Sequence, residues 1–78
     1  MKRIGKIVHY VPTEEDKNYM KNTNTICNQS DLLPAIIVAD WSPSLVNLKV
    51  ILDGVGDLWK TSVKKGSDAG QWNDIPQE

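Results

Sequence analysis

Several residues of the chain have side chains suited to catalysis or metal binding, but none stands in a pattern that supports either. His9 is the single histidine and lies in a strand-like segment, where we expect a structural residue rather than a general base or ligand. Cys27 is the single cysteine, so it forms no internal disulfide, and no histidine lies near it in sequence to activate it. Asp53 and Asp57 are too few carboxylates for a typical calcium site, and the Gly-Val-Gly stretch at 54–56 lacks the lysine and helix of a phosphate loop. We therefore expect a protein that is not an enzyme, with no cofactor and no metal site.

Length and charge narrow the classes of protein to which the chain can belong. A chain of 78 residues encloses only one apolar core, so we expect a single domain over residues 1–78. Nine basic against ten acidic residues leave no overall basic excess of the kind that holds nucleic acid. The longest apolar run, residues 35–39, is far shorter than the ~20 residues that cross a membrane, and no signal-peptide stretch is present. These features predict a cytoplasmic protein with no membrane partner.

Apolar, often β-branched residues alternate with polar ones between clusters of turn-forming residues, which is typical of β-strands. The pattern predicts four strands and a short fifth one, at residues 6–11, 34–41, 45–52, 57–64 and 71–72. Five short strands with tight turns favour a small barrel over an open sheet. The predicted fold class is therefore all-β, a small five-stranded antiparallel SH3-like barrel.

The stretch between the first two predicted strands, about residues 12–33, is polar and has few apolar anchors. Thr13 could cap a short helix that runs to about Lys21, because its hydroxyl can accept from the third amide beyond it. The composition favours instead one long polar loop, which in a compact domain is usually functional or disordered. We expect the loop.

Turn chemistry predicts which side chains of the central hairpin face the core. A type II′ turn at Gly54-Val55 pairs Val50 with Trp59. A turn at Asp53-Gly54 shifts the pairs by two residues and leaves the faces unchanged. In either register Trp59 lies inside, together with Val46, Leu48, Val50 and Leu52.

The preceding turn, centred on Pro43-Ser44, extends the same argument to the second strand. It places Ile37, Ala39 and Trp41 inside and Asp40 outside, where the charge of the carboxylate stays solvated. A one-residue slip would bury Asp40 without an obvious partner, and such burial is costly. We therefore reject the slip.

The outer face of the predicted sheet has polar, basic and apolar rows. The basic row sets Lys49 opposite Lys60, and the two repel unless the second register holds or an anion binds there. The apolar row needs a cover, from the chain or from a partner, and consists of Ile36, Ile51 and Leu58. Trp72, near the polar C-terminal segment, is the tryptophan we expect to be exposed. The aromatic residues could line a peptide groove or stack bases, but the register favours a core role for Trp41 and Trp59.

Several short segments, taken together, point to a known group of proteins. They are Gly5-Lys6-Ile7-Val8-His9-Tyr10, Pro34-Ala35-Ile36-Ile37-Val38, Trp41-Ser42, Val46-Asn47-Leu48, Asp53-Gly54, Thr61-Ser62-Val63, and Gly66 followed by Gly70-Gln71-Trp72. In this order they resemble a group of small proteins encoded by tailed phages and prophages, and the likeness covers most of the chain apart from the long loop. The resemblance implies a phage or prophage origin, a barrel fold, and a location in the host cytoplasm or on the virion. No activity is associated with the group, so it assigns no functional residues.

These observations predict a non-enzymatic interaction or accessory module of phage or prophage origin, whose partner is another protein or a second copy of itself. The candidate binding residues are Ile36, Ile51, Leu58, Trp72, Lys49 and Lys60. The alternative is a small β-barrel that binds nucleic acid through lysines and one tryptophan, namely Lys49, Lys60, Lys64, Lys65 and Trp72. A steep loss of affinity with salt would identify the alternative.

Overall fold

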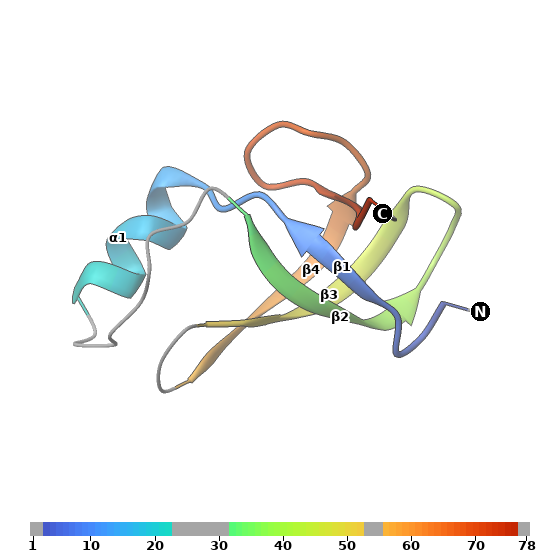
Figure 1. The fold of residues 1–78 in the computed structure, drawn as a ribbon, viewed down its shortest axis with the longest axis horizontal. Helices are drawn as coiled ribbons and strands as arrows, with labels where there is room; N and C mark the ends of the chain where they lie inside the picture. Colours follow the sequence, from blue (N-terminus) through green and yellow to red (C-terminus); the bar gives the residue numbers. More distant parts are fainter. Residues whose placement is uncertain (1–2, 23–31, 53–55, 77–78) are drawn as a thin grey trace.

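The computed structural model describes residues 3–22, 32–52 and 56–76. Its elements are β1 (Ile7–Tyr10), α1 (Glu14–Asn22), β2 (Leu33–Asp40), β3 (Leu45–Ile51), β4 (Asp57–Lys64) and β5 (Trp72–Asp74). The strands form one antiparallel sheet in the order β4-β3-β2-β1-β5, which curls into a half-barrel (Figure 1). The predicted all-β class with five antiparallel strands is confirmed, and the assignment to SH3-like barrels in particular stays a prediction.

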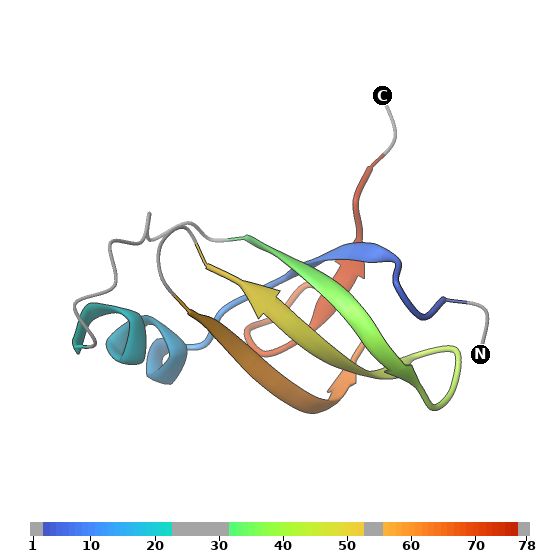
Figure 2. The ribbon, with the colours of Figure 1, turned by 90° about the horizontal axis from the view of Figure 1, so that it is seen from below.

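The two edge strands of the sheet meet at one end of the half-barrel. Lys65, directly after β4, forms an isolated parallel bridge with Trp72 of β5. The amide of Gly66 donates a hydrogen bond of 2.8 Å to the carbonyl of Trp72, and the amide of Lys65 donates one of 2.8 Å to the carbonyl of Ser44. Figure 2 views β2, β3 and β4 from outside the curl, with β5 behind them. The sheet is thus closed where β4 runs toward β5.

Helix α1 replaces most of the first half of the predicted loop. The hydroxyl of Thr13 accepts from the amide of Asp16 at 3.0 Å, and the Asp16 carboxylate accepts from the amide of Thr13 at 3.0 Å. This reciprocal capping satisfies donors that a helix N-terminus leaves open. The long-loop prediction is therefore wrong for residues 14–22, and the Thr13-capped helix is the structure observed. The rest of the predicted loop, including Cys27, lies largely outside the described residues.

The core occupies the inside of the curl and draws on every strand. Val46, Leu48 and Val50 of β3 are fully buried, as predicted, and Leu52 is 5% exposed. The remaining buried apolar side chains are Val8, Tyr10, Met20, Leu33, Ala35, Ile37, Val63 and Trp72. Met20 brings α1 onto this core. Among the described residues, no helix is both long enough and apolar enough to span a membrane.

A β-bulge reverses the predicted orientation of β4 near the turn. Val50 pairs with Leu58 and not with Trp59, so Leu58 packs against the core and Trp59 points to solvent. The register shifts next to Ser62, which has a positive φ of 53°. The extra residue of the bulge inverts the alternation of inward and outward side chains between the bulge and the turn. Val63 lies on the other side of the bulge and faces the core as predicted. The predicted inner position of Trp59 and outer position of Leu58 are both wrong.

A second bulge, directly after Ile37, has the same effect on the end of β2. Ile37 is fully buried as predicted, but Asp40 pairs with Val46, and its side chain is only 5% exposed. Trp41 is 63% exposed, so its predicted core role is wrong. The burial of Asp40 that the sequence argument rejected does occur, because Arg3 supplies the missing partner.

Trp72, which we expected to be exposed, is fully buried at the closed end of the half-barrel. Its indole nitrogen donates to the carbonyl of Ser44 at 3.2 Å. Two cations, the Arg3 guanidinium and the Lys65 ammonium, each lie 5.3 Å from the centre of the ring. The prediction failed because the bridge between Lys65 and Trp72 draws this segment into the barrel.

Candidate functional site

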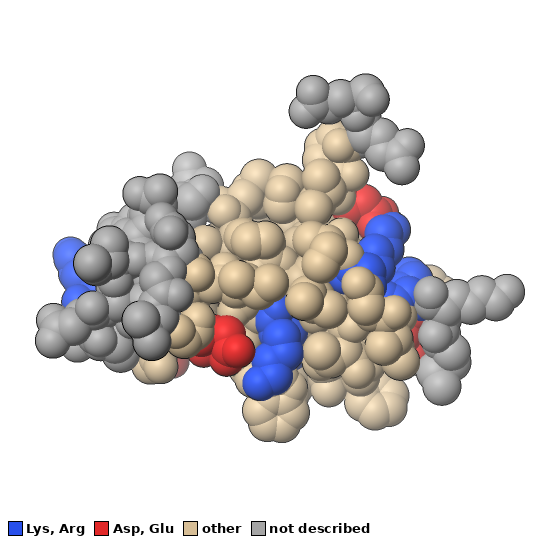
Figure 3. Space-filling model, turned by 60° about the horizontal axis from the view of Figure 1, so that its bottom comes forward, with Lys and Arg blue, Asp and Glu red and all other residues tan. Residues whose placement is uncertain are grey.

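The clearest functional feature of the molecule is the surface of β2, β3 and β4 that faces away from the core, which we name the outer face. Register places Ile36, Lys49 and Trp59 side by side across the three strands. The next row of the same face pairs Ile51 with Asp57. Figure 3 shows a side of the molecule on which uncharged side chains cover most of the surface and charged ones are few. Such a surface is suited to binding through apolar contact.

Two tryptophans dominate the exposed apolar side chains of the described chain. Trp59 is 64% exposed and Trp41 is 63% exposed, whereas Val38 and Ile51 are 40% and 42% exposed. Scattered exposed aliphatic residues are common on protein surfaces. Two large aromatic side chains with this much exposed surface are less common. Binding a partner would remove a large apolar area of both rings from water.

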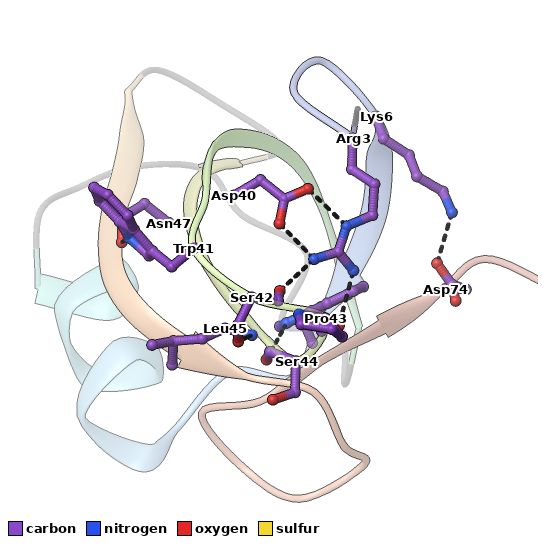
Figure 4. A network of polar contacts seen from close by, with 11 residues as sticks. Arg3, Lys6, Asp40, Trp41, Ser42, Pro43, Ser44, Leu45, Asn47 and Asp74 are labelled. Atoms are coloured by element: carbon purple, nitrogen blue, oxygen red, sulfur yellow. Dashed lines mark hydrogen bonds and ion pairs between the residues drawn. The ribbon is translucent and has the colours of Figure 1, made fainter. Parts of the chain in front are cut away.

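A polar anchor positions Trp41 at the edge of the outer face. Its indole nitrogen donates to the side-chain oxygen of Asn47 at 3.0 Å (Figure 4). The same oxygen accepts from the amide of Ser62 at 2.8 Å, so Asn47 links the end of β2 to the bulge in β4. The tryptophan is therefore attached through its polar nitrogen, while most of its ring surface remains exposed.

The outer face also has two charges of opposite sign that form no ion pair within the described part of the chain. Lys49 lies directly across the strand pair from Trp59, and Asp57 lies across from Ile51. Both charged residues are exposed. No ion pair involves either of them among the described residues. Both groups are available to charges on a partner.

The structure distributes the predicted binding residues over both sides of the sheet. Ile51 and Lys49 are exposed on the outer face, and Ile36 is half-buried there. Leu58 is half-buried and packs against the core, and Trp72 is fully buried, so both are turned away from the outer face. Lys60 also leaves the outer face, as described below. Sequence reasoning missed Trp41, Trp59 and Asp57, because each bulge changes which residues face outward.

Lys60 belongs to a buried polar cluster between β4 and α1. It pairs with Leu48 in the sheet, so it does not oppose Lys49 as predicted, and its ammonium forms an ion pair with Asp16. The hydroxyl of Tyr10 donates to Asp16 at 2.6 Å. The Asp16 side chain is 3% exposed and the Lys60 side chain 32%. The cluster fastens the helix to the sheet.

The pKa values of this cluster follow from burial and hydrogen bonding. Burial alone raises the pKa of Asp16, but the hydrogen bonds from Lys60, Tyr10 and the Thr13 amide outweigh it and hold the pKa below its ordinary value of 3.8. Burial and the bond to the Asp16 carboxylate raise the pKa of the Tyr10 phenol. Both shifts keep Asp16 ionised and Tyr10 protonated, the states that the hydrogen bonds require.

A second polar network surrounds Trp72 at the closed end. The Arg3 guanidinium donates to both carboxylate oxygens of Asp40, at 2.6 and 2.8 Å, and to the carbonyls of Ser42 and Pro43 (Figure 4). The hydrogen bonds that Arg3 donates to the carboxylate lower the pKa of Asp40. The network fixes the turn between β2 and β3.

The same end of the barrel has a second acidic group with two cationic partners. Asp74 accepts from Lys6 at 2.9 Å and from Lys65 at 3.1 Å. Hydrogen bonds from these two lysines lower the pKa of Asp74. Asp74 thereby ties the start of β1 and the end of β4 to β5.

Of the residues considered for catalysis or metal binding, His9 and Asp57 lie in the described part of the chain. His9 pairs with Pro34 and Asn73 in the sheet, and its Nδ1 is buried without a hydrogen-bond partner. Among the described residues, no three histidine, cysteine or acidic side chains gather in a way that could hold a metal ion. Asp53 and Cys27 lie outside the described part of the chain.

The fold and this surface together define a class: a small all-β protein with an aromatic, mainly uncharged outer face. Comparison of the chain with protein-family models, with curated proteins and with solved structures gives no match. The outer face is therefore the feature from which a function can be inferred.

Proposed function

We propose that this chain is a non-enzymatic interaction module that binds a protein surface through its outer face. One observation carries the proposal: Trp41 and Trp59 are each nearly two-thirds exposed on that face. The core does not need them, since Trp72 and Tyr10 already provide its largest side chains. Aromatic residues are enriched at protein interfaces and often dominate their binding energy. The resemblance to small phage and prophage proteins suggests in addition that the module has an accessory role and is of phage or prophage origin.

The free edge of the sheet is a less suitable binding element than its face. β4 pairs only with β3 over most of its length, so a partner strand could in principle add there. However, Lys60 points inward from this edge and a bulge interrupts it at Ser62. Inward charges and bulges are two devices by which edge strands resist pairing with other chains. Binding through side chains of the outer face therefore fits this sheet better than strand addition.

A crosslinking experiment tests the proposal. The tagged protein is expressed in its native host, crosslinked and purified, and compared with the double variant Trp41→Ser/Trp59→Ser. The matched control is Tyr19→Ser, which removes an aromatic side chain, 49% exposed, from α1. We expect crosslinked protein adducts with wild type and control and their loss from the double variant, with all three folded by circular dichroism. Equal adducts from the double variant would refute the proposal.

Most of the residues that the nucleic-acid alternative requires are buried or already paired within the protein. Trp72 is buried, Lys60 is paired with Asp16, and Lys65 is hydrogen-bonded to Asp74. Lys49 and Lys64 remain without ion pairs among the described residues, too few for a track along a phosphate backbone. Binding of a single-stranded oligothymidylate that weakens steeply with salt would restore this alternative.

A further inference from the structure

We propose that the outer face binds a second copy of this chain through a two-fold symmetric contact centred on Ile51 and Trp59. This inference rests on the proposed function and specifies the partner. The contact is argued from four exposed residues that form a diamond on β3 and β4: Lys49, Ile51, Asp57 and Trp59.

The sheet register fixes the geometry of the diamond. Lys49 is directly opposite Trp59, and Ile51 is directly opposite Asp57. Directly paired residues of antiparallel strands lie on the same face, about 5 Å apart, and diagonal neighbours about 7–8 Å apart. One diagonal therefore joins the two apolar residues, Ile51 and Trp59. The other diagonal joins the two charges, Lys49 and Asp57.

This arrangement is complementary to itself under a two-fold rotation. When two identical faces meet about an axis in the contact plane, residues on the axis meet their own counterparts, and residues on either side exchange partners. An axis along the apolar diagonal places Ile51 against Ile51 and Trp59 against Trp59 of the second copy. Lys49 then meets Asp57 of the second copy, and the reciprocal ion pair forms as well. The contact has an apolar centre with two ion pairs beside it.

The charges of the outer face favour a second copy over an unrelated protein. Lys49 and Asp57 have no ion pair within the described chain, and each is the complement that the other needs. The formal net charge of the whole chain is −1, so two copies repel each other only weakly. The protected β4 edge directs association to the face, where this diamond lies.

Charge-swapped variants test the contact by analytical ultracentrifugation over a wide range of protein concentration. We expect reversible dimers of wild type and a fall of at least about tenfold in the association constant for Lys49→Asp or Asp57→Lys, because each places like charges together twice. The double variant Lys49→Asp/Asp57→Lys should dimerise again. An equimolar mixture of the single variants should form heterodimers, since both cross-copy pairs are then of opposite sign. Lys64→Asp, a charge reversal elsewhere on β4, should dimerise like wild type.

The outcomes separate this inference from the proposed function. Wild type that stays monomeric at all concentrations would refute the second copy, and so would single variants that dimerise as well as wild type or a mixture that does not associate. The proposed function would still stand if crosslinked adducts with another protein depended on Trp41 and Trp59. Loss of dimers in Lys49→Asp with full recovery in the charge-swapped double variant would support the two-fold contact and no other docking mode.

Discussion

Replacing Asp16 by Asn should destabilise the protein strongly, although the two side chains have nearly the same shape. The substitution keeps a side-chain oxygen that can accept from Tyr10 or from the Thr13 amide, but it removes the charge that faces Lys60. The Lys60 ammonium then loses its only ion pair among the described residues, and the buried site loses charge-assisted hydrogen bonds.

The magnitude follows from the burial of the two partners. Breaking a fully buried ion pair by removing one partner costs about 3–5 kcal/mol, and a hydrogen bond to a charged group contributes about 1.5–3 kcal/mol. Asp16 is 3% exposed, but Lys60 is 32% exposed and can regain part of its hydration. We therefore expect Asp16→Asn to lower the free energy of unfolding by about 2–3 kcal/mol. For a domain of this size that is a fall of roughly 10–20 °C in Tm.

Urea unfolding followed by far-ultraviolet circular dichroism measures this change, and a double-mutant cycle with Lys60→Met isolates the ion pair. Lys60→Met leaves the Asp16 carboxylate buried without its cation, so it should also be destabilising. The double variant should lose less stability than the sum of the two single variants, by about 1–2 kcal/mol. Additive losses, or an Asp16→Asn protein within about 0.5 kcal/mol of wild type, would refute the assignment of this cluster as the attachment of α1.

Three further predictions follow from other parts of the molecule. Trp72→Ala should cost about 3–5 kcal/mol of unfolding free energy, whereas Trp59→Ala, assayed at low protein concentration, should change it by less than about 0.5 kcal/mol; similar losses would contradict the assigned inner and outer positions. Ser62→Val should destabilise the protein by about 1–2 kcal/mol and Ser62→Gly should not, because the positive φ of 53° suits glycine and crowds a branched side chain. The pKa values of Asp16 and Asp74 are lowered in the folded protein, so their contribution to stability is present above their ordinary value of 3.8 and is lost as pH falls through the folded values. Thermal unfolding should therefore show a Tm that declines below about pH 4, and a Tm unchanged down to pH 2 would contradict the two ion-paired sites.

The strands and most of the core were predictable because they depend on local alternation. Val46, Leu48 and Val50 alternate with other residues between turn-forming clusters. A strand with one buried face fits that pattern only when these three side chains point into the core. The helix at residues 14–22 was visible as a capping pattern at Thr13. The polar composition of the segment nevertheless favours a loop, because the apolar contact that holds the helix, through Met20, is tertiary.

The inner and outer positions of the tryptophans could not be predicted by the same reasoning. The predicted register assumes that inward and outward side chains alternate along each strand without interruption. Each bulge inverts this alternation for all residues on one side of it. The bulge in β4 moved Trp59 to the surface, and the bulge in β2 did the same for Trp41. A bulge stabilised by a distant side chain, as Ser62 is by Asn47, leaves little trace in the local sequence.

Asp40 illustrates a second reason for the failed predictions. The sequence shows no obvious partner for its carboxylate, so the sequence predicts that Asp40 stays solvated. The cation that neutralises the carboxylate is Arg3, 37 residues earlier in the chain, brought close by the pairing of β1 with β2. Partners that meet only after the sheet has formed cannot be identified from spacing, so a buried charge is a poor criterion for rejecting a register.

The pairing of β1 with β5 determines when the protein can complete its fold during synthesis. β2, β3 and β4 are joined by short connections and can pair as soon as they leave the ribosome. β1 is made before them but needs β5 on its other side, and Lys6 and Asp74 are 68 residues apart in sequence. Trp72 covers one end of the apolar interior, so a chain without it would leave that end open. Chains that lack Trp72 should therefore be more sensitive to proteases than chains that contain it.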